Sequence, residues 1–184
     1  MDEIMFKNAV LAILKARPGM GSIQLRKALI IADAAHNALH GESITGVRYI
    51  KHKFGPVPDD EAFNVLIKMD FPLHLVEIIE EPIGHVTQNA YYAAAEPDYS
   101  LFTRSQIDIL NYSAATAYKY GALRLSDMTH DDVYHQTPMG DEIPLNMVCA
   151  MKVSGYDTAP FTRKEKTAVK DFLKSDEACL FDFV

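Results

Sequence analysis

The stretch of residues 28–39 constrains the fold more than any other part of this 184-residue chain. It reads Ala-Leu-Ile-Ile-Ala-Asp-Ala-Ala-His-Asn-Ala-Leu, so it is apolar on nearly every side of a helix, with Asp33 and His36 three residues apart on one face. A helix that is apolar all round is normally buried in a core. The stretch is too short and too polar to span a bilayer, so we expect a helix at the centre of a globular domain.

The overall composition fits such a domain. Apolar residues make up 48% of the chain and charged residues 23%, as in ordinary soluble proteins. The net charge is −7, which makes nucleic acid an unexpected partner and favours a partner with a basic surface. The two cysteines do not form a disulfide framework, and the first residues are acidic where a secretory signal would be basic. We therefore expect a cytoplasmic protein without a membrane segment.

Cap and breaker residues divide the chain into helical segments. The predicted helices cover about residues 6–17, 22–40, 58–71, 103–121 and 125–130. Ser22 is expected to cap the central helix, and Pro58 is expected at the first position of the helix that follows it. Thr103 and Gln106 have the spacing of a reciprocal cap, and Ser126 is expected to cap the short helix.

Two β-prone runs, at residues 75–80 and 86–93, flank the turn sequence Pro82-Ile83-Gly84 and predict an antiparallel hairpin. The fold class is therefore α+β and mostly α: a compact helical domain with a small antiparallel hairpin or sheet inserted between two helical groups. The sequence Phe-Thr-Arg, which begins at Phe102 before the Thr103 cap, occurs again at Phe161 and predicts a further helix start there. We assign residues 1–150 to one domain and residues 151–184 to a C-terminal helical extension packed on it.

Asp33 and His36 are the first candidate functional residues. A buried carboxylate is costly unless it is satisfied, and the possible partners are His36, a tyrosine hydroxyl or backbone amides of a neighbouring loop. The pair is either structural or a catalytic or ligand-binding dyad. His36 and His40 have the i, i+4 spacing of a metal chelate, but they lack the glutamate of a His-Glu-x-x-His motif. We predict no metal site and no cofactor.

Two further segments contain potentially reactive side chains. Lys51-His52-Lys53, beside Tyr49 and Phe54, could touch nucleic acid, but lysines also protect strand edges from unwanted pairing, and we favour that interpretation. Ser126 and His130 lie in a segment rich in hydroxyls and acids, without a nucleophile elbow. We therefore predict that the protein is not an enzyme.

Three segments combine into a recognisable pattern. The first is residues 28–36, the second begins at Gly41 and ends with Gly55-Pro56-Val57-Pro58, and the third covers residues 125–144. In order and spacing they resemble, over roughly residues 5–150, the Panacea domain family, which comprises the SocA-like antitoxins and phage-associated GepA-like proteins.

The resemblance implies a non-enzymatic protein-binding module that neutralises a cognate toxin, either by direct contact or as an adaptor that delivers the toxin to a protease. The polar positions that match the pattern are Asp33, His36, Tyr49, Lys53, Ser126, Thr129 and His130. The motif loop contributes Gly46, Gly55, Pro56 and Pro58. We expect this loop to fold over the Asp33 helix and meet the segment from Ser126 to His130, so that the polar positions form one cluster.

Two other functions remain open. Helices followed by a hairpin are compatible with a winged-helix-like DNA-binding regulator, although the net charge of −7 opposes phosphate contacts. An enzyme would use Asp33, His36 and His130 as acid–base groups, and these side chains would then have to line a common pocket.

Overall fold

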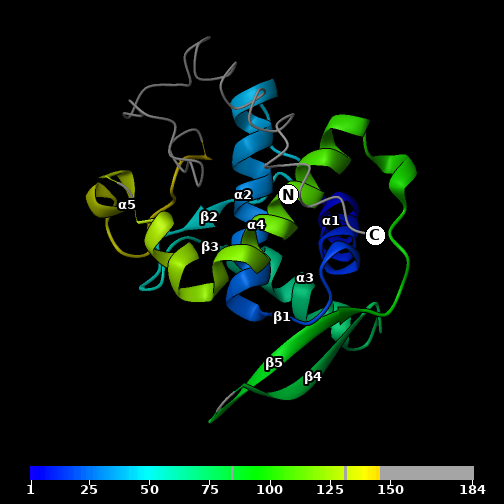
Figure 1. Cartoon of the computed structure of the whole chain (residues 1–184). Coiled ribbons are helices and arrows are strands. Elements are labelled where there is room, and N and C mark those ends of the chain that lie inside the picture. The colour runs from blue at the N-terminus through cyan, green and yellow to red at the C-terminus, as the bar shows by residue number, and fades with distance from the viewer. Residues whose placement is uncertain (84, 131, 146–184) are drawn as a thin grey trace.

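A computed structural model describes residues 1–83, 85–130 and 132–145 of the chain (Figure 1). This part is mostly helical, with small antiparallel sheets between the helices, as predicted. The elements are α1 (Glu3–Ala16), β1 (Met20–Gly21), α2 (Ser22–His40), β2 (Tyr49–Ile50), β3 (Val57–Pro58), α3 (Asp60–Asp70), β4 (Val76–Ile83), β5 (Val86–Ala93), a 3-10 turn (Tyr99–Leu101), α4 (Arg104–Met128) and α5 (Asp132–Gln136). The predicted extension at 151–184 and the cap at Phe161 lie outside the described residues.

Helix α2 is the centre of the fold, as its apolar sequence predicts. It contacts α1, α4 and β3, and in Figure 1 it stands in the middle of the molecule. The residues from Ala28 to Asp33 are all between 0% and 2% exposed. None of the helices in the described part of the chain is both long and apolar enough to cross a membrane.

The starts of α2 and α3 differ from the prediction by one or two residues. The N-cap of α2 is Gly21 rather than Ser22, and the Gln24 side chain accepts a hydrogen bond from the Gly21 amide at 3.1 Å. The N-cap of α3 is Asp59, which accepts from a backbone amide in the first turn, whereas Pro58 lies in β3. An aspartate oxygen satisfies an orphan amide that proline cannot, so the acid marks the helix start.

Helix α4 confirms one predicted cap and corrects another. Thr103 and Gln106 form the expected reciprocal cap, with distances of 2.9 and 3.3 Å. Gly121 has φ 67° and ψ 171°, so the helix breaks where the sequence predicts. The helical turns resume at once and continue to Met128, and Ser126 lies inside them rather than at an N-cap. The Ser126 hydroxyl is used instead for a contact with a distant loop.

The predicted hairpin is present and acquires a third strand. Strands β4 and β5 pair from Val76↔Ala93 to Ile83↔Val86, and β1 adds to the other edge of β5. Figure 1 shows this hairpin extending away from the helices. A second sheet consists of β2 and β3, which pair Tyr49 with Pro58. These two short strands hold the loop that the sequence pattern singled out.

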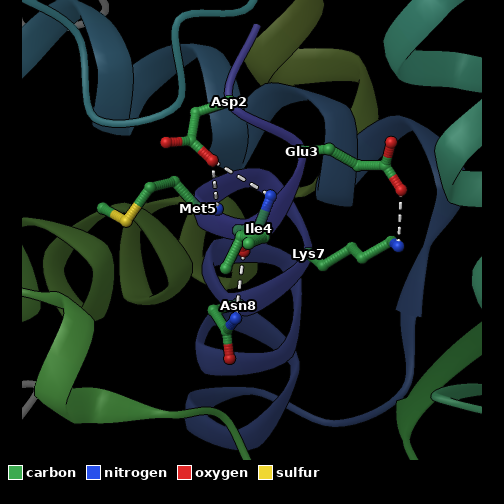
Figure 2. A network of polar contacts seen from close by, with 6 residues as sticks. All are labelled: Asp2, Glu3, Ile4, Met5, Lys7 and Asn8. Atoms are coloured by element: carbon green, nitrogen blue, oxygen red, sulfur yellow. Dashed lines mark hydrogen bonds and ion pairs between the residues drawn. The ribbon is translucent and has the colours of Figure 1, made fainter.

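The start of α1 is held by its own polar side chains (Figure 2). The Asp2 carboxylate accepts from the amides of Ile4 and Met5 at 3.0 and 3.1 Å, which is an N-cap. Lys7 pairs with Glu3 at 2.6 Å, one turn apart. The Asp2 amide also donates to the Thr45 carbonyl at 3.0 Å, so the N-terminus is tied to the loop that follows α2.

Candidate functional site

Asp33 lies at the centre of the first polar cluster. Its carboxylate is 0% exposed and accepts four hydrogen bonds. The backbone amides of Ile44 and Thr45 donate to Oδ1 at 2.9 and 3.0 Å. The hydroxyls of Thr45 and Tyr49 donate to Oδ2 at 2.5 and 2.7 Å. Of the partners considered from the sequence, the tyrosine and the loop amides are the ones used, and His36 is not.

The electrostatics of this cluster indicate a structural role. Complete burial raises the pKa of Asp33, and the hydrogen bonds from Thr45 and Tyr49 oppose that rise. Burial, followed by the charge of Asp33, raises the pKa of Tyr49 well above its ordinary range, so this hydroxyl keeps its proton and remains a donor. Four donors leave little of the carboxylate free for a substrate. The cluster therefore fastens the loop after α2 onto the helix.

His36 fastens the same loop at a second point. Its Nδ1 lies 2.7 Å from the Glu42 carbonyl oxygen, and because a carbonyl only accepts, Nδ1 is the protonated nitrogen. The ring lies tilted by 37° against the His40 ring, 4.5 Å between centroids, and His40 Nε2 lies 3.0 Å from the Ser105 hydroxyl on α4. Within residues 1–83, 85–130 and 132–145, no group of three potential ligands could hold a metal ion.

The second cluster surrounds the loop at residues 52–56. Three alternate carbonyls of this loop each accept a hydrogen bond from a side chain on a different helix. Tyr134 of α5 donates to His52 at 2.7 Å. Ser126 of α4 donates to Phe54 at 2.9 Å, and Lys27 of α2 donates to Pro56 at 3.0 Å. Because these carbonyls belong to one short segment, the loop holds three helices together.

The sequence reasoning missed Tyr134 in this cluster, and it also missed Lys27. Lys27 is 1% exposed, and burial, with a smaller contribution from the charge of Arg26, lowers its pKa from 10.5 to about 7. No described carboxylate forms a salt bridge with it. A sequence signal existed, because Lys27 precedes Ile30 and Ile31 by one helical turn on the buried side of α2. Thr45, which was missed in the Asp33 cluster, stands directly before Gly46 in the motif loop.

Gly55 is required by its surroundings. Its φ is +93°, and a Cβ atom there would lie 2.2 Å from Lys27 Nζ and 2.6 Å from Thr129 Oγ1. Contacts below 3.0 Å are essentially never seen for Cβ atoms, so any side chain at this position would displace a buried neighbour. Thr129 itself donates to the carbonyls of Leu125 and Ser126 at 3.1 and 3.0 Å. The absence of a side chain at Gly55 thus allows the loop to lie against α2 and α4.

The predicted polar positions form two clusters rather than one. The loop does fold over α2 and meet the segment from Ser126 to His130, as expected. However, the hydrogen bonds of the described residues join Asp33 with Tyr49, and Ser126 with the Phe54 carbonyl. The clusters are separate because Lys27 and Asp33 lie at different heights along helix α2, where they face different parts of the same loop.

Two of the predicted residues, Lys53 and His130, contribute less directly to the cluster around the loop at residues 52–56. The Lys53 side chain is exposed and lies over the Phe54 ring at 5.4 Å, while its backbone carbonyl lies 3.3 Å from the Tyr134 hydroxyl. His130 stacks on the Tyr134 ring at 4.0 Å and lies 3.5 Å from the Ser126 hydroxyl. Both therefore support the loop cluster from its outer side.

A surface groove of about 760 Å³ adjoins the β2–β3 sheet. Its lining contains both the basic segment at residues 51–53 with Arg48 and the acidic start of α3 from Asp59 to Glu61. Arg48 pairs with Asp59 at 3.0 Å, and Lys51 donates to the Thr137 carbonyl at 2.7 Å. Opposite charges face each other here, so the groove does not offer phosphates a uniformly basic surface.

Comparison with known protein families places these clusters in a recognised domain. The family model described as "Antitoxin SocA-like, Panacea domain" matches residues 25–133, which is more than half of the chain and contains most of α2 and the whole motif loop. No curated protein matches the chain. The matched range includes Lys27, Asp33, Gly55 and Ser126. The chain belongs to the SocA-like antitoxin family with the Panacea domain.

Proposed function

We propose that this protein is an antitoxin that neutralises a cognate toxin by direct contact. The observation that carries the proposal is the family match over residues 25–133. The geometry supports binding rather than catalysis, because the buried polar residues are occupied by contacts within the chain. Asp33 has four donors, and Lys27 and Ser126 each donate to a loop carbonyl.

Two alternatives have less support. An enzyme that uses Asp33, His36 and His130 would need them around one pocket, but Asp33 is sealed in the core and His130 stacks on Tyr134 in the other cluster. A winged-helix regulator would need cations on its hairpin. Neither β4 (VEIIEEPI) nor β5 (VTQNAYYA) contains a lysine or an arginine, and β4 contains three glutamates, which would repel phosphates.

Co-expression with the protein encoded by the adjacent reading frame tests the proposal. If that protein stops growth alone, we expect the antitoxin chain to restore growth and to co-purify with the toxin. Absence of both rescue and binding would refute the proposal. A pulse-chase measurement of the toxin separates the two modes: direct masking leaves the toxin's half-life unchanged, whereas a protease adaptor would shorten it.

A further inference from the structure

Helix α3 and its C-cap expose large apolar side chains. The buried side consists of Ala62, Val65, Leu66 and Met69. On the other side Phe63 is 45% exposed, Ile67 52% and Phe71, the C-cap residue, 70%. Phe63 and Ile67 lie one above the other because they are four residues apart on the helix. Phe71 follows at the C-cap, where its backbone is extended (φ −136°, ψ 131°), and its ring meets the His74 ring edge-on at 5.7 Å between centroids. We call these three exposed side chains the stripe.

An exposed apolar stripe of this kind indicates an interaction surface. Exposed apolar side chains that stand alone are common, but contiguous patches mark binding sites or become aggregation liabilities. Aromatic side chains are also enriched at the centres of protein interfaces. The helix contacts α1 and strand β4 of the hairpin.

The charges around the stripe specify the chemistry of the partner. Asp60 and Glu61 are exposed at the start of α3, and Asp70 is half-buried at its end. Lys68 is the cation of this helix, and its charge faces Glu3 of α1, whose pKa is lowered mainly by Lys7 and to a smaller extent by Lys68. The rim of the stripe is therefore mainly acidic, in keeping with the net charge of −7. Complementarity therefore favours a partner whose contact surface has apolar side chains surrounded by lysines and arginines.

We propose that the stripe formed by Phe63, Ile67 and Phe71 is the surface that docks the toxin, through an apolar toxin surface rimmed by basic residues. This inference rests on the proposed antitoxin function and adds the place of contact to it. The polar clusters then act indirectly. Tyr49 in β2 and Pro56, directly before β3, are both fastened to α2, and β3 leads into the Asp59 cap of α3.

A matched pair of variants tests the docking surface. Ile67→Glu places a charge in the stripe, and Ile79→Glu makes the same change at a 41%-exposed isoleucine of β4, outside the stripe. The probe is the protein from the adjacent reading frame, titrated onto the full-length chain by calorimetry. We expect Ile67→Glu to raise the Kd at least tenfold and Ile79→Glu to change it less than twofold, with unchanged melting temperatures. Phe71→Ser serves as a second stripe variant.

The charge of the rim is tested separately. If basic toxin residues face it, raising the salt concentration weakens wild-type binding, and Asp60→Asn reduces that salt dependence. A salt-independent Kd would contradict the proposed chemistry of the partner.

The outcomes distinguish this inference from the proposed function. If the wild-type chain does not bind the probe, the antitoxin proposal fails, and the docking surface with it. If the wild-type chain binds and Ile67→Glu binds equally well, the function stands and the docking surface is wrong. If the wild-type chain alone is a dimer that Ile67→Glu dissociates, the stripe belongs to a second copy, which also overturns the inference.

Discussion

Substitution of Gly55 by alanine tests how tightly the loop at residues 52–56 lies against α2 and α4. The added Cβ would lie 2.2 Å from Lys27 Nζ and 2.6 Å from Thr129 Oγ1, and the residue has a φ of +93°. Both neighbours are 1% exposed, and both use those atoms in hydrogen bonds. The substitution therefore combines backbone strain with the displacement of a buried polar group.

The magnitude follows from these two contributions. A left-handed backbone costs a residue with a Cβ about 1–2 kcal/mol relative to glycine. To relieve the contact, the Lys27 amine must leave the Pro56 carbonyl, and a buried polar group without its partner costs about 1–3 kcal/mol. We expect Gly55→Ala to lower the free energy of unfolding by about 2–5 kcal/mol, a large part of the 5–15 kcal/mol typical of a domain.

Two other glycines provide matched controls. Gly41 and Gly140 have φ values of +84° and +89°, and an added Cβ at either position would meet nothing within 4 Å. Their alanine variants therefore report the backbone contribution alone. Urea unfolding followed by circular dichroism gives the three free energies. We expect Gly55→Ala to cost at least about 1 kcal/mol more than either control. Equal losses at all three positions would refute the close packing of the loop against Lys27.

Three further substitutions test the clusters. Tyr49→Phe removes one donor from buried Asp33 and should lower the free energy of unfolding by about 1.5–3 kcal/mol in urea; a loss within error would contradict a donor role. Ser126→Ala should cost about 1 kcal/mol and accelerate hydrogen exchange at the Gly55 amide, whereas unchanged exchange would contradict its hold on the loop. For Lys27→Met, the measurement is the free energy of unfolding as a function of pH, compared with the wild type. The unfolded Lys27 keeps its proton up to about pH 10.5 and the folded one only to about pH 7, so wild-type stability should rise relative to the variant between these values, by at most about 1.4 kcal/mol per pH unit. Parallel stability curves would contradict the buried amine.

The sequence predicts the local elements well, because local physics determines them. The apolar stretch in α2 leaves no solvent-exposed side, so its burial follows from residues 28–39 alone. The reciprocal cap of Thr103 and Gln106 needs only a three-residue spacing. The hairpin depends on two β-prone runs and one turn. Strand β1, in contrast, is two residues long, and its pairing with β5 depends on a distant partner.

The partners of the polar residues could be predicted only in part. The sequence indicates that Asp33 must be satisfied, but the choice among His36, a tyrosine and loop amides depends on where the following loop crosses the helix. The carbonyls that accept from Lys27 and Ser126 have no sequence signal at all, since every residue has one. Because these partners depend on the path of the loop and not on residue type, residues that the family pattern groups together can belong to different clusters.

The two clusters use opposite chemistry at separate positions of one helix, α2. Asp33 accepts hydrogen bonds from the segment that begins at Ile44, and Lys27 donates to the end of the same segment at Pro56. Helix α2 therefore holds both ends of the segment that leads into α3. If toxin binding occurs on α3, substitutions in the clusters should weaken neutralisation only as far as they reduce stability. Substitutions in the stripe, such as Ile67→Glu, should weaken neutralisation without loss of stability. A plot of neutralisation against stability separates the two groups, and a cluster variant of normal stability that fails to neutralise would assign the polar residues a direct role.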